Sequence, residues 1–336
     1  MQSYRFSRFG HLDHLQRRDD AMPRPGRGEV LLRVRASALN YRDLALLNGR
    51  YPMSHQDGLI PLSDAAGEVV ELGEDCRRFA VGDRVCNTFF PEWFGGPFPP
   101  PQAARQYGSN LDGWLCQYKA VSEEALVRAP DHLDWAEAAT LPCAALTAWT
   151  ALTGPQPVKA GDTVLTQGSG GVSLFAIQLA KLLGARVIAT TSSADKAQRL
   201  RELGADEVID YRASPDWGAA ARELSGGRGV DRVVEVGGQG TLEQSLQATA
   251  IGGEIAVIGF LDEGAAPLDF MRFFLSGATL RRIAVGHREG FEAMLRAIEQ
   301  HRLRPALDRV FAFDDARAAW ERFASRRNLG KVVIAH

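Results

Sequence analysis

The segment Gly168-Ser169-Gly170-Gly171-Val172-Ser173 has the spacing of a G-x-G-x-x-G turn, with Ser173 in place of the third glycine. In such a turn the first glycine permits the tight bend, the second lets backbone amides approach a pyrophosphate, and the small third residue allows helix-on-strand packing. The segment follows the apolar run TVLTQ and precedes the helical pattern GVSLFAIQLAKLLG. A helix N-terminus there adds partial positive charge, so this context predicts a dinucleotide site at residues 168–172.

The residues after the next apolar run, ARVIATTSS, distinguish NAD from NADP. An NAD site places a carboxylate there, roughly 20 residues past the first glycine, to bind the ribose hydroxyls. This chain has hydroxyl side chains instead, and Ser192 and Ser193 with Lys196 one turn later suit a 2′-phosphate. Tyr211, after the third strand, adds another hydroxyl. The predicted cofactor is therefore NADPH.

Two patterns of secondary structure divide the chain. Up to about residue 130, short β-type runs between glycines and prolines predict a mostly antiparallel, barrel-like lobe, with strands at 29–37, 66–73, 82–90 and 117–122. From residue 162, apolar strands alternate with helices, which predicts βαβ units and a parallel sheet covered on both faces. Helices are expected at 171–184, 193–204, 216–225, 241–250 and 268–276. The tail, with helices at 291–301 and 314–325 and the final strand GKVVIA, returns to the first lobe.

Composition narrows the class of protein. The 336 residues carry a formal net charge of −2, which gives no electrostatic reason to expect nucleic acid or an anionic membrane as partner. The opening residues lack the apolar core of a signal peptide, and no later run approaches a membrane span. The four cysteines show no C-x-x-C spacing, which argues against a disulfide framework. A cytoplasmic protein is expected.

Several motifs together resemble the medium-chain dehydrogenase/reductase superfamily, and within it the zinc-free quinone oxidoreductases and alcohol dehydrogenase-like proteins. The matching motifs are ALNYRD (38–43), AGEVVELG (66–73), VGDRV (81–85), LPCAALTAW (141–149), QGSGGVSLFAIQLAK (167–181), GADEVIDYR (204–212) and GKVVI (330–334). The resemblance implies a GroES-like catalytic domain at 1–130 and 288–336, a Rossmann domain at 131–287, and an active site in the cleft between them. It also implies that Lys196 and Tyr211 hold the 2′-phosphate.

Zinc-dependent members of that superfamily place a cysteine, a His-Glu pair and a second cysteine around a catalytic ion. Here Asn40 replaces the first cysteine, and Ser63 and Asp64 replace the pair, so that Cys143 alone remains. These side chains match poorly the N/S ligands that zinc prefers. Residues 91–113, in the place of the structural-zinc lobe, contain no cysteine. We expect no metal, and Cys143 is interpreted as a small buried apolar residue.

The residues of the first lobe suggest chemistry without a metal. Tyr51 is the leading proton donor, because enoyl reductases of the superfamily resemble the chain here and carry a catalytic tyrosine; the alternative is an ordinary packed tyrosine. Asn40 is expected to contact the nicotinamide ribose or the substrate oxygen. Tyr41 and Asp43 are candidates for the same constellation, and the alternative for Asp43 is a structural hydrogen-bonding residue.

Further cofactor contacts are predicted around the nicotinamide and the pyrophosphate. Strand ends face the ligand in a doubly wound sheet. The predicted contacts are Thr147, Gly259, Phe260, Val285 and Gly286, with Lys331, Arg326 and Arg327 near the pyrophosphate. The aromatic, proline-rich loop at 91–113 is either a hydrophobic lid or a loop packed on its own side chains or in a dimer contact.

Three functions remain open. The first is an NADPH-dependent, zinc-independent reductase of a quinone or an α,β-unsaturated carbonyl, with a small hydrophobic substrate. The second is a zinc-free alcohol dehydrogenase or ketone reductase, for which His55 and Asp64 are the nearest candidate bases. The third is an NADPH-binding protein without useful turnover. The resemblance further implies a homodimer, in which TLRRIAVG at the sheet edge pairs with its twin.

Overall fold

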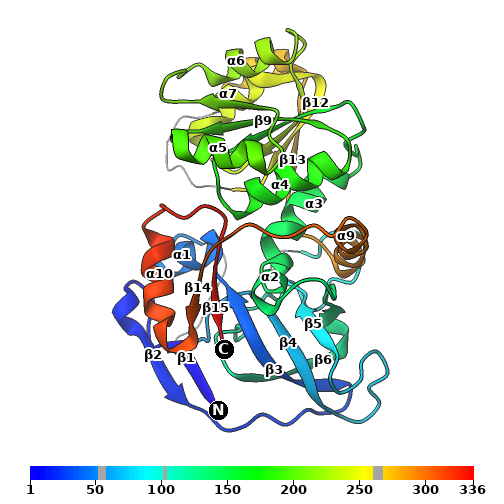
Figure 1. The fold of residues 1–336 in the computed structure, drawn as a ribbon, viewed down its shortest axis with the longest axis vertical. Helices are drawn as coiled ribbons and strands as arrows, with labels where there is room; N and C mark the ends of the chain where they lie inside the picture. The colour runs from blue at the N-terminus through cyan, green and yellow to red at the C-terminus, as the bar shows by residue number, and fades with distance from the viewer. Residues whose placement is uncertain (52–57, 101–103, 260–267) are drawn as a thin grey trace. The chain divides into compact units, whose positions relative to one another are not determined.

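The computed structural model describes residues 1–51, 58–100, 104–259 and 268–336 (Figure 1). These residues form two compact units. The first unit consists of Met1–Leu146 and Gly286–His336, and the second of Thr147–Val285. Residues 131–146, which the sequence analysis groups with the nucleotide-binding domain, lie in the first unit.

The second unit is built on a six-stranded sheet in which every pair of neighbouring strands is parallel. The strand order is β10-β9-β8-β11-β12-β13, so the order reverses between β8 and β11. The strands are β8 (Thr163–Gln167), β9 (Arg186–Thr191), β10 (Glu207–Asp210), β11 (Val230–Glu235), β12 (Thr249–Val257) and β13 (Thr279–Arg282). This is the doubly wound order, and ligands of such sheets bind at the carboxyl ends of the strands beside the reversal.

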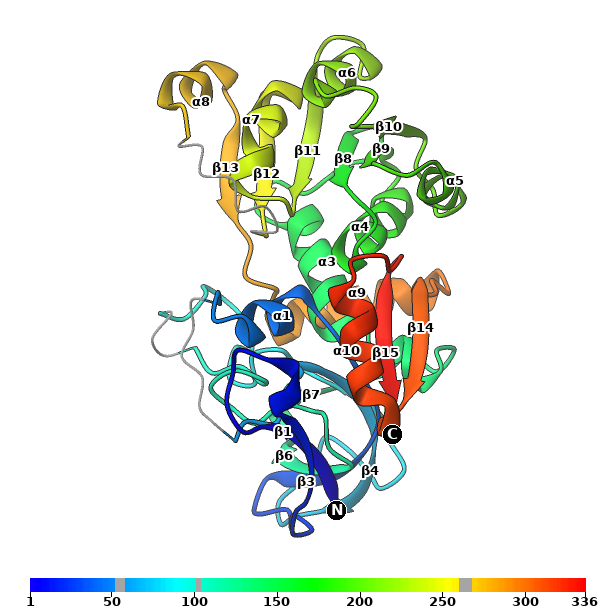
Figure 2. The same cartoon turned by 90° about the vertical axis from the view of Figure 1, so that its left-hand side faces the viewer.

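Helices cover both faces of this sheet, with α4 and α5 on one face and α6 and α7 on the other (Figures 1 and 2). The helices of the unit are α3 (Leu146–Thr153), α4 (Gly171–Leu182), α5 (Ala194–Glu202), α6 (Trp217–Leu224), α7 (Gln239–Ala248) and α8 (Phe270–Ser276). Strand residues Leu165, Ile188 and Val233 pack with helix residues Trp217 and Leu246 in one buried cluster. Because both faces are covered, the central strand β8 is buried over its whole length, whereas the edge strand β13 is partly exposed.

The first unit contains a seven-stranded sheet and a separate two-stranded hairpin of β1 and β2. All pairs are antiparallel except β14 with β15. The strands are β1 (Gln2–Phe6), β2 (Leu15–Asp19), β3 (Glu29–Ala38), β4 (Asp64–Leu72), β5 (Arg84–Asn87), β6 (Tyr118–Ser122), β7 (Leu126–Arg128), β14 (Leu307–Ala312) and β15 (Lys331–Ala335). The helices are α1 (Tyr41–Leu47), α2 (Trp135–Ala138), α9 (Arg288–Gln300) and α10 (Ala316–Ala324), with a π-helical turn at Leu141–Ala145.

The antiparallel register of β15 on β3 pairs Val333 with Ala38, so the chain after β3 runs beside the start of β15. The predicted return of the tail to the first lobe is therefore confirmed. Helix α10 packs on β14 and β15, and its Trp320 is fully buried with Phe6 and Leu44 in the core of the unit. The fold thus brings together α1, β4 and β15, which are far apart in the sequence.

The fold class is confirmed, but several elements differ from the sequence-based expectation. The prediction has no counterpart for β1, β2, β7, β14, α1 and α2. Strand β14 has no fully buried residue, and β2 is almost entirely exposed, so neither shows the apolar run that identifies a strand. Helix α7 ends at Ala248, and Thr249 and Ala250 already belong to β12. Among the described residues, no helix is both long and apolar enough to cross a membrane.

Candidate functional site

The predicted phosphate turn lies at the carboxyl end of β8, where it leads into α4. Gly168 has φ of +71°, a conformation that favours glycine, and its amide donates to Thr190 O at 2.8 Å. Gly170 is the N-cap of α4, and a Cβ placed on it would meet no atom within 4 Å. Ser173 is buried, and its hydroxyl donates to Gln167 O at 2.6 Å. The segment is therefore a strand-turn-helix unit with space beside Gly170, and its binding of a dinucleotide stays a prediction.

The residues predicted to hold a 2′-phosphate lie at the same edge of the sheet. The parallel register places Asp210 of β10 beside Thr191 of β9, and the amide of Tyr211 donates to Thr191 O at 3.0 Å. Ser193 caps α5, and Lys196 lies in the first turn of that helix. Tyr211 is 41% exposed, and Ser192, Ser193 and Lys196 are half-buried, so these side chains are accessible.

The buried carboxylate of Glu235, which was not predicted as a site residue, lies where the strand order reverses between β8 and β11. Glu235, the last residue of β11, is fully buried and accepts hydrogen bonds from the amides of Gly237 and Gly238 at 2.8 and 2.9 Å. It also accepts from the side chains of Gln167, Thr241 and Ser245. Gln167 ends β8, so this network ties the two central strand ends together. A charge inside the apolar run VDRVVEV is the signal that could have identified it.

The remaining predicted cofactor residues of the second unit lie at the ends of strands or at the first and last residues of the unit. Gly259 follows β12, and its amide donates to Glu235 O at 3.2 Å. Val285 follows β13 and has the left-handed φ of +52°. Thr147 is buried in the first turn of α3. Phe260 lies outside the described residues.

In the first unit, a buried ammonium group links the residues that replace the zinc ligands. Lys331 Nζ donates to Asn40 Oδ1 at 2.5 Å and to Leu39 O at 2.7 Å, and lies 3.7 Å from Asp64 Oδ2. Asn40 Nδ2 donates to Ser63 Oγ at 3.3 Å, and that hydroxyl donates to Asp64 Oδ1 at 2.8 Å. The side chains of Lys331 and Asp64 are 3% and 0% exposed. Lys331 is thus held inside the first unit, and its predicted contact with a pyrophosphate stays a prediction that the sequence alone supports.

This donor set does not fit zinc. Burial raises the pKa of Asp64, while Lys331 and the hydrogen bonds of Asn40 and Ser63 oppose that rise. Cys143 is partly buried, and burial and the Asp64 carboxylate raise the pKa of its thiol. The backbone amide of Cys143 donates to Asp64 Oδ2 at 3.2 Å. An amide, a hydroxyl and a carboxylate beside an ammonium replace the nitrogen and sulfur ligands of zinc sites.

Tyr51, the predicted proton donor, lies in a second polar cluster of the same unit. Its hydroxyl donates to Gln106 Oε1 at 3.1 Å. The guanidinium of Arg42 lies 5.0 Å from the centroid of the Tyr51 ring and donates to Asp43 Oδ1 at 3.1 Å. Asp43 in turn accepts from the amide of Asn40 at 2.8 Å, so the two clusters are continuous. Burial raises the pKa of Asp43 to about 6, although Arg42 opposes that rise. Arg42 and Gln106 were not predicted as site residues.

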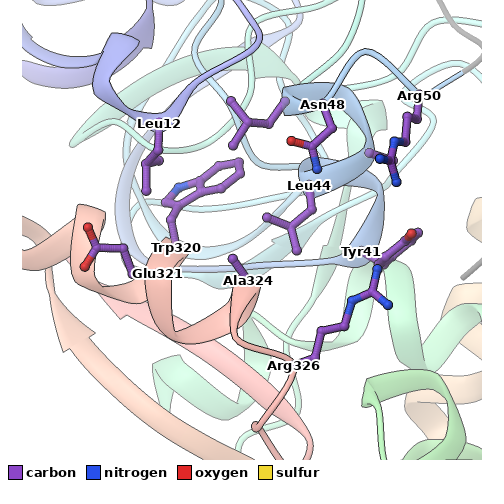
Figure 3. Close-up of a pocket in the computed structure, with 11 residues that line it drawn as sticks. Leu12, Tyr41, Leu44, Asn48, Arg50, Trp320, Glu321, Ala324 and Arg326 are labelled. Carbon is purple, nitrogen blue, oxygen red and sulfur yellow. The ribbon is translucent and has the colours of Figure 1, made fainter.

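A cavity of about 200 Å³ lies between α1 and α10 in the first unit (Figure 3). Tyr41 and Arg326, both named in the sequence analysis, line this cavity, and the Arg326 guanidinium lies 5.8 Å from the Tyr41 ring centroid. Leu44 and Trp320 form part of its apolar wall.

The aromatic residues at the start of the 91–113 loop pack on one another and on the start of α9. Trp93 lies 4.9 Å from Phe98 and 5.4 Å from His287 between ring centroids. The amides of Arg288 and Glu289 donate to the carbonyls of Trp93 and Phe94, both at 3.0 Å. These contacts match the expected loop packed on its own side chains, and the lid stays a prediction.

Comparison with known proteins identifies the family. The model described as "Alcohol dehydrogenase GroES-like domain" matches residues 26–131, and that described as "Zinc-binding dehydrogenase" matches residues 171–300. A zinc-type alcohol dehydrogenase-like protein of Schizosaccharomyces pombe is 40% identical over 313 residues, which cover 91% of this chain and 90% of the relative. A quinone oxidoreductase of Pseudomonas aeruginosa is 30% identical over 98% of each chain. The chain belongs to the medium-chain dehydrogenase/reductase superfamily and is an NAD(P)-dependent oxidoreductase of that family.

Solved structures agree with this assignment. An NAD-dependent alcohol dehydrogenase has 32% sequence identity and a TM-score of 0.92, with complete coverage of both chains. A mycobacterial protein in complex with NADPH has 28% identity and a TM-score of 0.83, also with complete coverage. The GroES-like and Rossmann-like units are therefore confirmed.

Replacing Lys331 tests the buried ammonium cluster. We expect Lys331→Met to lower the free energy of unfolding by about 3 kcal/mol, because the Asp64 carboxylate then stays buried without its cation. Adding Asp64→Asn should recover part of that loss, since no uncompensated charge remains. Urea denaturation of the cofactor-free protein at neutral pH measures both effects, with Lys159→Met, at an exposed lysine, as control. A double variant no more stable than Lys331→Met contradicts the pairing.

Proposed function

We propose that the chain is a zinc-independent, NADPH-dependent reductase of quinones or α,β-unsaturated carbonyl compounds. The observation that carries this proposal is the Lys331 ammonium hydrogen-bonded among the residues that replace the zinc ligands. Without a Lewis acid, an isolated ketone is poorly activated, whereas a quinone or an enone accepts hydride with less assistance. The relative named quinone oxidoreductase supports the same class of acceptor.

Tyr51 is the proposed proton donor for this reaction. Bound NADPH supplies the hydride, and a proton must then reach the enolate or hydroquinone anion that hydride addition produces. The Tyr51 hydroxyl is held by Gln106 in the absence of substrate, at 3.1 Å from its Oε1. A substrate oxygen that replaces Gln106 as acceptor would place this hydroxyl for proton transfer.

The preference for NADPH rests on the polar groups at the ends of β9 and β10. Ser192, Ser193, Lys196 and Tyr211 supply three hydroxyls and one ammonium there, which suit a 2′-phosphate. Asp195 is exposed in the first turn of α5, where an acid stabilises the helix dipole. The structural neighbour in complex with NADPH supports this preference, and the NAD-dependent neighbour gives the alternative that the experiment must exclude.

A zinc-free alcohol dehydrogenase or ketone reductase is the second candidate, favoured by the alcohol dehydrogenase names of several relatives. Removing hydride from an alcohol needs a base at the hydroxyl. One candidate base, His55, lies outside the described residues. The other, Asp64, accepts hydrogen bonds from Ser63 and the amide of Cys143 and lies beside the ammonium of Lys331. These contacts make Asp64 a poor base. The third candidate is a protein that binds NADPH without useful turnover.

A steady-state screen with NADPH against quinones, enones, ketones and alcohols separates these candidates. We expect NADPH oxidation with quinones or enones that a chelator does not change, and no bound zinc by metal analysis. Tyr51→Phe should lower kcat by about 100-fold, the smaller end of the effect of a general acid, while Tyr118→Phe should not. Chelator-sensitive oxidation of alcohols would support the second candidate, and NADPH binding without turnover the third.

The cofactor preference is tested at Lys196. We expect Lys196→Ala to raise the KM for NADPH by about 10- to 100-fold, because a charge-assisted hydrogen bond to the 2′-phosphate is lost. The KM for NADH should not change, since NADH has no such phosphate. Lys159→Ala, at an exposed lysine of the same unit, is the matched control. A wild-type preference for NADH would overturn the cofactor assignment.

We further propose that two copies associate through β13 and α8. Strand β13 is the last in the sheet order, so its outer edge is unpaired among the described strands. Phe270, Phe274 and Leu275 of the neighbouring α8 are 67%, 68% and 72% exposed, which is unusual for apolar side chains in such a cluster. A twin strand on β13 would extend the sheet, and the same contact would cover α8.

Sedimentation velocity tests this association. The wild type should sediment as two chains of 36.6 kDa, and the double change Phe274→Asp and Leu275→Asp should produce the monomer. Met22→Asp, at an apolar residue of the first unit that is 52% exposed, should leave the dimer intact. A monomeric wild type would disprove the proposal.

A further inference from the structure

Arg42 is an unusual residue for the interior of a protein, because its side chain is only 6% exposed. Two aromatic rings flank its guanidinium, with Tyr51 and Phe89 centroids at 5.0 and 5.2 Å from Cζ. Its carboxylate partner is Asp43, 3.1 Å from Nη1, whose side chain is 1% exposed. A buried guanidinium is costly unless its surroundings compensate for the lost hydration, so each of these contacts is energetically significant.

Gln106 connects Arg42 to the hydroxyl of Tyr51. Its Oε1 accepts from Tyr51 at 3.1 Å and from Arg42 Nη2 at 3.4 Å, and its side chain is buried. A guanidinium only donates, so Gln106 must present its oxygen and not its amide nitrogen to this pair. The oxygen is thereby fixed as the acceptor that holds the Tyr51 hydroxyl in one orientation.

The charge of Arg42 also acts on Tyr51 directly. Burial disfavours the charged form of Arg42, but a phenolate at Tyr51 and the carboxylate of Asp43 more than offset this, so the pKa of Arg42 is raised above its ordinary value. Arg42 therefore stays cationic beside the Tyr51 ring, whose centroid lies 5.0 Å from Cζ. The guanidinium is in place before any substrate binds, which is the arrangement that stabilises charge developing during a reaction.

We propose that Arg42 is a positioning residue for Tyr51: it fixes the acceptor Gln106 and stabilises the phenolate that Tyr51 becomes on protonating the substrate. This inference rests on the proposed function. In the step concerned, the O–H bond of Tyr51 breaks and its proton binds to the anion left by hydride addition. The electron pair of that bond stays on the phenolate oxygen, which later recovers a proton from water.

A double-mutant cycle between Arg42 and Tyr51 tests this proposal. We expect Arg42→Met to lower kcat for an enone or a quinone by about 10-fold, with little change in KM, because the cation beside the developing phenolate is lost. In the Tyr51→Phe background, where no phenolate forms, the same change should lower kcat by less than about 2-fold. Arg42→Lys, which keeps the charge, should lose less than Arg42→Met, and Arg50→Met, at an exposed arginine, should resemble the wild type.

Nuclear magnetic resonance of ring-labelled tyrosine gives a readout that does not depend on activity. The chain contains six tyrosines, and the Tyr51 signal is assigned by its loss in Tyr51→Phe. In the cofactor-free protein, Arg42→Met should shift this signal, whereas Arg50→Met should not. The thermal midpoint of each variant identifies any that fail to fold.

The outcomes separate this inference from the proposed function. Equal losses of kcat from Arg42→Met in the wild-type and Tyr51→Phe backgrounds would show a merely structural Arg42 and overturn the inference. An unchanged Tyr51 signal in Arg42→Met would do the same. Wild-type turnover in Tyr51→Phe would instead refute Tyr51 as the proton donor, and with it the proposed function of that residue.

Discussion

A lysine ammonium inside a protein must be surrounded by acceptors and an opposing charge, because the lost hydration is otherwise too costly. Lys331 satisfies this requirement with a carbonyl, a side-chain amide and the carboxylate of Asp64. These partners come from the loop before α1 and from the first residue of β4, while Lys331 itself begins β15. The electrostatic requirement of one residue thus fixes how three elements of the first unit meet.

Asn40 links the Lys331 cluster to a second buried cation. The amide of Asn40 is held at both ends, with its oxygen on Lys331 and its nitrogen on Ser63. Its backbone amide donates to Asp43, which accepts from Arg42 beside Tyr51. Two buried cations, Lys331 and Arg42, therefore lie in one continuous set of hydrogen bonds.

How far the sequence predicts this structure depends on the range of the interactions involved. Periodicity identifies the strands and helices of the second unit, because the apolar residues of each follow a local pattern, and local spacing identifies Gly168. Short or exposed strands such as β14 carry no such pattern. Arg42 and Gln106 are 64 residues apart, and Gln167 and Glu235 are 68 apart, so only the tertiary fold brings these pairs together. Composition and spacing contain no signal for such contacts.

The buried carboxylate of Glu235 has a consequence for ligand affinity. It binds the amides of Gly237 and Gly238, and glycines lose more conformational entropy on ordering than any other residues. Here that entropy is lost during folding, because the carboxylate holds both amides in the protein alone. A ligand that binds at this edge of the sheet meets a loop already in place, so its binding free energy is not reduced by the cost of ordering two glycines.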